Sequence, residues 1–536
     1  MGIILRKTVY IIIVLQMTYF ISGCSSPAGD ADTGDLGITI GSLADVIYPE
    51  SVAVDGYGLV AGLRGTGSSE CPPQIRTYLT RYILTQLSAN AKTATDELIN
   101  SLDTAVVLVE AEMPVQDAKG RYFDLRVSAL PGTQTTSLDG GWLFPMELKA
   151  AGSFGITTEV LADAEGPVFL DKIGSESPDP RTGYILGAGK NLTEYKIGLA
   201  LKKADFKLTN EIRNQLNERF GREVARAVLS GQIEVTIPAR FQQQRRRFVS
   251  IIRAMYLTET PELTLKRINY FTRQLVALPD SQESEIALEA IGNQSLVELA
   301  GLLNSSDERV RLRAARCMLN LGSDAGLQIL RQIAMDKQSA YRIEAMESIF
   351  ASARPSEAAY IARSLLNDDD FDVILAAYEQ LRGLNDLAIS RETIGKSFFV
   401  EQIGRSEKKV IFVSRSGQPK VVLFDAPIYC NSGIFIQSPD KEITVNAPAG
   451  QEYVTLIREH PKHPGVIGQM KCSFDLSDMI RRLCTEPIVE GEKGPGGLGV
   501  SYSDAIALLK QMCDKGAIDA EFHAGPMPKI GLNVKK

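Results

Sequence analysis

The sequence predicts an α+β protein whose β-rich regions are interrupted by an α-helical solenoid. Short strand patterns with a few helices fill residues 36–270, and helices rich in Ala, Leu, Arg and Glu follow one another over 279–390. β patterning resumes over 395–490, before a last helix and tail at 495–536. A chain of 536 residues, 44% of them hydrophobic, is long enough to bury a separate core for each of these regions.

Residues 1–24 have the pattern of an export signal. Basic residues precede an apolar run of 13 residues, Thr8–Phe20, which is too short to span a bilayer. Ile21–Cys24 is similar to a bacterial lipobox, which predicts lipidation of Cys24; the alternative is an ordinary secretory signal that contains a cysteine. Residues 25–35 then read as a flexible tether. We therefore expect a periplasmic protein, anchored by lipid at the outer membrane.

The first strands and helices of the 36–270 region follow from periodicity and turn signals. Val106–Val115 and Tyr122–Leu130 alternate around a short turn, which predicts a β-hairpin. Apolar residues recur at helical spacing in Gln74–Asn90 and in Asn210–Leu229. Gln232–Pro238 reads as a further strand, so this region is expected to be mixed α+β.

A glycine cluster in GYGLVAGLRGTG might suggest a nucleotide site, but its spacing does not fit one. It reads GxGxxxG rather than GxGxxG, no βαβ pattern surrounds it, and no Gly-Lys-Ser/Thr directly follows the cluster. We expect the five glycines to serve tight turns and close backbone packing instead. They are Gly56, Gly58, Gly62, Gly65 and Gly67.

The helical region contains an internal repeat. Glu308–Leu319, Ser339–Phe350 and Phe371–Leu381 resemble one another, and their central alanines (Ala315, Ala345 and Ala376) are 30 and 31 residues apart. Small residues at a fixed period permit close stacking of helix pairs, as in HEAT-type repeats. Such an array offers a surface to an unknown partner protein; the alternative is an ordinary helical bundle. We expect 279–390 to be an insertion whose deletion leaves the other domains folded.

The C-terminal region is expected to be β-rich and closed by one helix. Ser501–Lys515 carries apolar residues on one side and follows a polar, glycine-rich connector, Glu490–Gly499. The predicted strands before it are Lys409–Val413, Val421–Phe424, Gly433–Gln437 and Tyr453–Ile457.

Six cysteines besides Cys24 allow up to three disulfides in an oxidising compartment, with 15 possible connectivities. Four of them lie in the C-terminal fifth of the chain and are candidate disulfide cysteines: Cys430, Cys472, Cys484 and Cys513. No CxxC occurs, which excludes thioredoxin-like and zinc-ribbon sites. Cys317 occupies an apolar helix position and is expected to be a buried free thiol.

Composition and motifs argue against several classes of function. A net charge of −7 disfavours a dedicated nucleic-acid binder. His460 and His463 lie in a proline-flanked loop without a third ligand, and His523 is the only other histidine, so no metal or cofactor is expected. Arg245–Arg247 could contact an anionic surface, although a solvated helix start is the simpler interpretation. No GxSxG or HExxH motif occurs, so we expect no enzyme and name no catalytic residue.

Five blocks, in order, resemble bacterial flagellar P-ring proteins. They are Gly56–Gly67, Thr104–Pro114 followed by Phe123–Leu130, Ser137–Leu148, Leu199–Pro238 and Gly499–Ala520. The resemblance implies a structural subunit that forms a homo-oligomeric ring around the flagellar rod in the periplasm. Its implied partners are further copies of itself, rod and L-ring proteins, and nearby peptidoglycan and outer membrane.

Three features depart from that family pattern: the lipobox at Cys24, the helical insertion, and the stretch 400–490, which matches the family poorly. They suggest a lineage-specific basal body with an added docking arm. An alternative from another class is that the chain is a lipid-anchored periplasmic scaffold with a P-ring-like domain. In that case the helical repeats would bind a partner protein, without a flagellar ring.

Replacing the lipobox cysteine tests the anchor. We expect Cys24→Ser to abolish lipidation, because the thiol that receives the diacylglycerol is gone, and to release the protein from membranes. Membrane fractionation and intact mass would measure both effects. Unchanged membrane retention without a mass difference would show that the signal is an ordinary secretory one.

Overall fold

The computed structural model describes residues 36–48, 51–86, 97–114, 120–153, 159–174, 179–193, 196–278, 280, 282–459, 467–487 and 496–530. The export signal, Cys24 and the tether lie outside the described residues. Among those described, no helix combines the length and apolar character needed to cross a membrane. The chain divides into two compact units, one from Met1–Ile47 and Ile197–Leu330 and the other from Tyr48–Lys196 and Arg331–Lys536.

The first unit is built on a four-stranded antiparallel sheet in the order β1-β8-β10-β9. Its strands and the first helices of the unit are β1 (Ala44–Ile47), β8 (Ile197–Leu201), β9 (Ala225–Leu229), β10 (Gln232–Val235), α2 (Ile40–Leu43), α5 (Phe206–Phe220), α6 (Arg245–Ala254) and α7 (Pro261–Ala277). Asp205 caps α5 by accepting the N–H groups of Lys207 and Leu208. The predicted helix Asn210–Leu229 is wrong in its second half, because Gly221 has a φ of 121° that ends the helix, and β9 follows.

The helical region follows as a succession of short helices. They are α8 (Glu283–Ile291), α9 (Leu296–Leu302), α10 (Glu308–Asn320), α11 (Asp324–Met335), α12 (Arg342–Ser352), α13 (Pro355–Leu365) and α14 (Phe371–Gly383). The repeat's central alanines are fully buried at Ala315 and Ala345, whereas in the third copy Ala377 is buried and its neighbour Ala376 is partly exposed. The boundary between the two compact units falls inside α11, so the limits expected at 279 and 390 do not separate them.

A fully buried carboxylate joins the first of these helices to α6. Glu285 on α8 has no exposed surface and accepts hydrogen bonds from Arg247 (2.6 Å) on α6 and from Arg313 (3.2 Å) and Arg316 (2.6 Å) on α10. Burial alone would raise the pKa of Glu285, but the charges of Arg247 and Arg316 outweigh it and lower the pKa to about 2. Nearby Glu289 accepts a further hydrogen bond from Arg247 (2.8 Å).

The cluster around Glu285 corrects two sequence expectations. Arg247 is buried between α6 and α8, so it neither contacts an anionic surface nor opens a solvated helix. Deletion of 279–390 would remove the carboxylates that neutralise Arg247 and leave a guanidinium uncompensated. The first helices of the region, α8 and α10, are therefore part of the core of the first unit, and deletion of 279–390 is expected to destabilise that unit.

A second fully buried carboxylate lies at the other end of the helical region. Glu401 accepts hydrogen bonds from Tyr378 and Arg382 of α14 and from Arg391 (2.8 Å) of the first strand that follows. Burial and the adjacent Glu401 carboxylate raise the pKa of the Tyr378 hydroxyl, which therefore stays protonated and donates.

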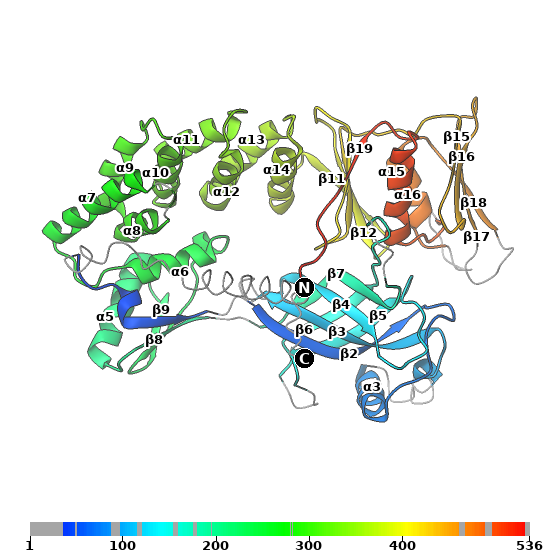
Figure 1. Cartoon of the computed structure of the whole chain (residues 1–536), viewed down its shortest axis with the longest axis horizontal. Coiled ribbons are helices and arrows are strands. Elements are labelled where there is room, and N and C mark those ends of the chain that lie inside the picture. Colours follow the sequence, from blue (N-terminus) through cyan, green and yellow to red (C-terminus); the bar gives the residue numbers. More distant parts are fainter. Residues whose placement is uncertain are drawn as a thin grey trace, which may run out of the picture. The chain divides into compact units, whose positions relative to one another are not determined.

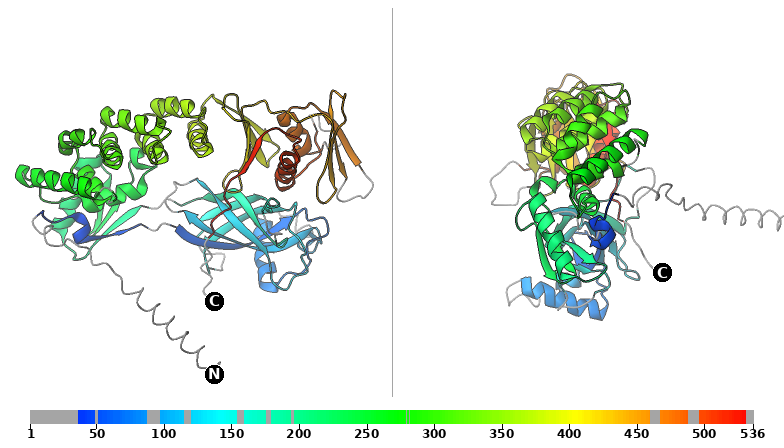
Figure 2. Two further views of the ribbon diagram at one scale, coloured as in Figure 1. Left: turned by 45° about the horizontal axis from the view of Figure 1, so that its top comes forward. Right: turned by 90° about the vertical axis from the view of Figure 1, so that its left-hand side faces the viewer.

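The second unit contains a closed six-stranded barrel in the order β2-β3-β4-β7-β6-β5 (Figures 1 and 2). Its strands are β2 (Ser51–Ala61), β3 (Thr104–Pro114), β4 (Tyr122–Ala129), β5 (Trp142–Ala150), β6 (Ala162–Pro167) and β7 (Thr182–Asn191). β3 and β4 are the predicted hairpin. α3 (Pro73–Gln86) packs beside the barrel, where Leu79 joins Leu59 and Val106 in a small core of its own.

The C-terminal part of the second unit places two helices between two sheets (Figure 1). The sheets are β11-β12-β14-β13-β19 and β15-β16-β17-β18, with α15 (Leu476–Cys484) and α16 (Tyr502–Asp514) sharing one hydrophobic core with both. The strands are β11 (Ile389–Ile394), β12 (Phe398–Ile403), β13 (Val410–Val413), β14 (Lys420–Phe424), β15 (Ile434–Gln437), β16 (Ile443–Ala447), β17 (Val454–Glu459), β18 (Ile467–Cys472) and β19 (Glu521–Ala524). The predicted final helix is confirmed.

Substitution of the buried Glu285 should destabilise the first unit. We expect Glu285→Gln to cost about 3–5 kcal/mol, because Arg313 and Arg316 then lose the carboxylate they share and Arg247 keeps only Glu289. Hydrogen exchange of the α6, α8 and α10 amides would measure the loss. Glu298→Gln on the exposed side of α9 is the matched control and should change protection little. Equal protection in both variants would contradict a structural role for the cluster.

Candidate functional site: barrel closure and the C-terminal junction

The glycine-rich segment forms β2, where it allows the barrel to close. A Cβ atom at Gly56 would lie 2.7 Å from Met146 Cε and 2.8 Å from the Glu147 carbonyl oxygen, and one at Gly58 would lie 2.6 Å from Met146 Sδ. The register between β2 and β5 is irregular between Asp55 and Val60, where Met146 lies over the glycines. These two positions therefore exclude larger side chains for reasons of space.

The three glycines after β2 serve the turn that follows. Gly62 and Gly65 have φ values of 83° and 86°, which side chains rarely tolerate. At Gly67 there is no room for a side chain, because a Cβ there would lie 2.1 Å from the carbonyl oxygen of Thr104. Each of the five glycines thus lies where space or backbone conformation disfavours a side chain.

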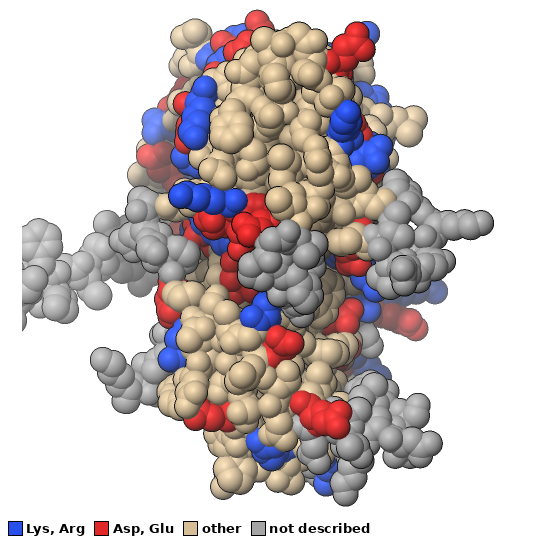
Figure 3. All heavy atoms as spheres, turned by 90° about the vertical axis from the view of Figure 1, so that its right-hand side faces the viewer, with Lys and Arg blue, Asp and Glu red and all other residues tan. Residues whose placement is uncertain are grey.

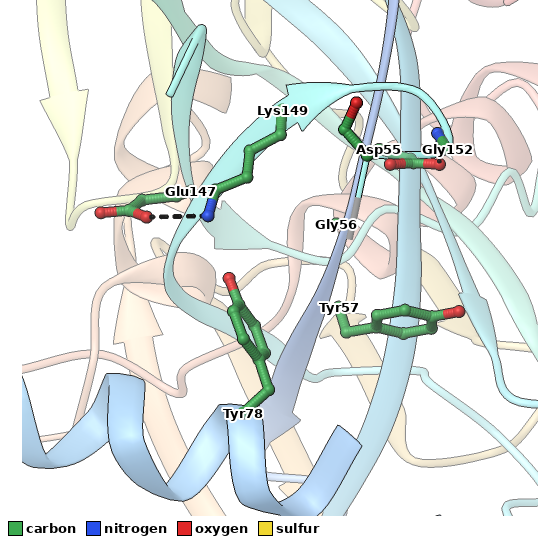
Figure 4. A pocket seen from close by; sticks show the side chains of 8 residues that line it. Asp55, Gly56, Tyr57, Tyr78, Glu147, Lys149 and Gly152 are labelled. Atoms are coloured by element: carbon green, nitrogen blue, oxygen red, sulfur yellow. Dashed lines mark hydrogen bonds and ion pairs between the residues drawn. The ribbon is translucent and has the colours of Figure 1, made fainter. Parts of the chain in front are cut away.

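A cavity of about 260 Å³ lies where β2 and β5 meet α3 (Figure 4). The Lys149 ammonium is buried there, 3.9 Å from a Glu147 carboxylate oxygen and 5.8 Å from the centre of the Tyr78 ring. Asp55 accepts the N–H of Gly152 at 2.9 Å. Burial raises the pKa of the Tyr78 hydroxyl, which therefore remains protonated at neutral pH. This arrangement neutralises charge internally and pairs no nucleophile with a general base.

The barrel is joined to the C-terminal part of the second unit by charged contacts at the start of α16. Lys172 bridges Asp139 (2.6 Å) of the barrel region and Asp504 of α16. Because the two carboxylates outweigh burial, the pKa of Lys172 is raised and the ammonium stays charged. The Ser503 hydroxyl accepts the N–H of Leu170 at 3.1 Å. Two segments more than 300 residues apart in the sequence are thereby held together.

A second contact of the same junction uses a carboxylate and two backbone amides. Asp124 of β4 accepts the N–H of Gly187 (2.7 Å) in the barrel and of Gly417 (2.8 Å) between β13 and β14. Burial raises the pKa of Asp124, although both amides favour its charged form. A cavity of about 200 Å³ remains between the two parts, lined among others by Arg64, Trp142 and Tyr502.

The candidate disulfide cysteines are free thiols in the structure. Cys430, Cys472 and Cys484 are core residues, and Cys513 packs against the same core. Burial raises the pKa of Cys430 and Cys513 to about 11 and of Cys472 to about 12, so the reactive thiolate is disfavoured. The C-terminal region is thus held by its hydrophobic core rather than by a disulfide staple. Cys317 is buried and free, as its apolar position indicated.

The histidines form no metal site in the part of the chain that the structure describes. His523 of β19 stacks on Phe371 with ring centres 4.1 Å apart, and His460 and His463 lie outside the described residues. No group of three or more potential metal ligands occurs among the described side chains. The geometry defines a modular α+β protein. A closed barrel contacts the C-terminal part of the second unit, and a buried glutamate lies at each end of the helical repeat region.

Two regions of the chain match known protein families. Residues 39–276 match the family "Flagellar P-ring protein", and residues 295–382 match HEAT repeats. The resemblance stated from the sequence is confirmed for these regions, and the repeats are of the HEAT type rather than an ordinary bundle.

Individual relatives agree with the family match. The chain is 31% identical over 242 residues to a flagellar P-ring protein of Campylobacter lari, covering 42% of this chain and 64% of the relative. It is 30% identical over 218 residues to one of Sodalis glossinidius, covering 37% and 56%. The chain thus spans about three fifths of the length of the relatives it matches.

Gly67→Ala tests the closure of the barrel. We expect a loss of about 2–3 kcal/mol in stability, because the new Cβ would overlap the Thr104 carbonyl and push the turn after β2 away from the start of β3. The matched control is Gly404→Ala, since no atom lies within 4 Å of a Cβ there. Urea denaturation of both full-length variants would measure the difference, and equal midpoints would contradict the packing argument.

Proposed function

We propose that the protein is a structural subunit of the flagellar P ring, a homo-oligomeric ring in the periplasm that surrounds the rod as a bushing. The observation that carries the proposal is the family match over residues 39–276, which includes the whole barrel and the sheet of the first unit. The matched relatives are named flagellar P-ring proteins. Further copies of the chain, rod proteins and L-ring proteins are the partners that follow.

The internal geometry supports a passive mechanical role. The fully buried carboxylates of Glu285 and Glu401 and the half-buried ammonium of Lys172 join elements to one another. The junction of the barrel with α16 also brings the block Gly499–Ala520, which resembles the P-ring family, against the matched N-terminal region. A subunit that transmits load needs such rigid joints and no cofactor.

A second candidate function is favoured by the HEAT match over residues 295–382. HEAT arrays bind proteins along extended surfaces. In this alternative the chain is a periplasmic scaffold, anchored by lipid at Cys24, that holds a partner on its repeats and forms no flagellar ring.

Purification of hook–basal bodies separates the two functions. We expect the tagged full chain to remain with detergent-extracted, acid-washed hook–basal bodies in stoichiometric amounts, and to label a ring around the rod in electron micrographs. Gly404→Ala should be incorporated normally, whereas Gly67→Ala should not, because its barrel is disturbed. Recovery of the protein only with outer membranes would contradict the ring and favour the scaffold.

A further inference from the structure

The sheet β15-β16-β17-β18 has two open edges. β15 and β18 are its outer strands, and neither is paired with another strand in the described part of the chain. All neighbours in the sheet are antiparallel, and the number of strands is even, so β15 and β18 run in opposite directions. A second copy of β15 placed beside β18 in a head-to-tail repeat would therefore continue the antiparallel alternation.

The two edges alternate in the same way between residues that face the sheet and residues that face outward. Ser438 donates its N–H to the carbonyl of Ile443 (2.9 Å), so Ile436 and Ser438 face β16 while Phe435 and Gln437 face outward. Glu459 donates its N–H to the carbonyl of Glu442 on the β16 side (2.9 Å). The main-chain groups of the alternate β17 residues, Leu456 and Arg458, therefore face β18.

The same alternation fixes which groups of β18 are outward. Gly468 and Met470 pair with β17, and Gln469 and Lys471 direct their main-chain groups away from the sheet. The registers place Phe435 and Lys471 in one cross-strand row, through Asn446 and Thr455. Gln437 and Gln469 lie in another cross-strand row, two residues further along each strand, whose side chains point to the same face. The Gln437 carbonyl accepts from Gln511 at 3.0 Å, and its N–H and both groups of Phe435 face the open edge.

Side chains at both edges are unusually apolar for an exposed strand. Phe435 is 65% exposed and Ile467 is 63% exposed. The unpaired N–H and C=O groups of an edge strand can pair with another chain, and exposed apolar side chains beside them favour such pairing. The outer face between the edges is almost uncharged, and Figure 3 shows it as a largely tan surface in its upper part. Its side chains include Thr444, Asn446, Thr455 and Ile457.

Lys471 on this face already contacts one aromatic ring. The Lys471 ammonium lies 3.8 Å from the centre of the Tyr453 ring, on the β18 edge. If the row is continued, the Phe435 ring of the next copy lies beside Lys471 and adds a second aromatic contact to the same cation. Gln437 and Gln469 then face each other and can exchange amide hydrogen bonds.

We propose that neighbouring copies of this chain pair head to tail through these edges, with β15 of one copy antiparallel to β18 of the next. Phe435 lies opposite Lys471, and Gln437 lies opposite Gln469. The contact is heterologous, so it leaves one open edge at each end of an incomplete assembly and none in a closed ring. The inference rests on the proposed function, because it specifies how the subunits of that ring meet.

Paired cysteines test this contact in cells that produce the full chain. The variant Phe435→Cys/Lys471→Cys should give a ladder of disulfide-linked multimers under mild oxidation, since Cα atoms of directly paired residues are about 5.5 Å apart, within disulfide range. Each single variant, and the unaltered chain with its native thiols, should give no ladder, because head-to-tail pairing never brings two identical positions together.

A displaced pair is the matched control. In Phe435→Cys/Ile467→Cys the second cysteine lies four residues from the paired position, about 13 Å along the strand, and should not cross-link. A ladder from this pair alone, or dimers from a single variant, would overturn the proposed register. Uncross-linked protein in intact basal bodies would overturn the edge contact while the ring function stands. A ladder in protein that is absent from basal bodies would support the edge contact and contradict the ring function.

Discussion

A buried carboxylate needs a buried cation, and this requirement fixes the helical region at both of its ends. Glu285 accepts hydrogen bonds from arginines of both α6 and α10. Glu401 accepts them from Arg382 of α14 and Arg391 of β11. Neither glutamate could be buried in isolation, because removing a carboxylate from water costs several kcal/mol. The HEAT repeats are consequently joined to their flanking regions by cores rather than by linkers.

This explains what the sequence could and could not predict. Helical periodicity located α16 and the helices of the repeat, and the alternation of β3 and β4 identified a hairpin. The Glu285 cluster was missed, because its partners are separated by some 30–40 residues and each charged side chain alone resembles a solvated one. A local backbone feature also prevailed over periodicity where Gly221 ends α5 and the apolar pattern continues into β9.

The sequence predicted the general roles of the glycines in the candidate site but not their contacts. Turn and packing roles for the five glycines followed from their spacing, whereas the particular obstacle at each (Met146 over Gly58, the Thr104 carbonyl at Gly67) depends on how the barrel closes. The junction between the barrel and α16 has no local signal at all, because Lys172 and Asp504 are distant in sequence. Similarity to a family in two separated blocks was the one indication that these segments meet.

Trp142, the only tryptophan in the chain, is among the residues that line the cavity between the barrel and the C-terminal part of the second unit. Excitation of indole therefore reports on this junction alone, without a background from the HEAT repeats or the first unit. Opening of the joint would change the solvent around that ring and hence its emission. The integrity of this junction can therefore be followed by tryptophan fluorescence in the unlabelled protein.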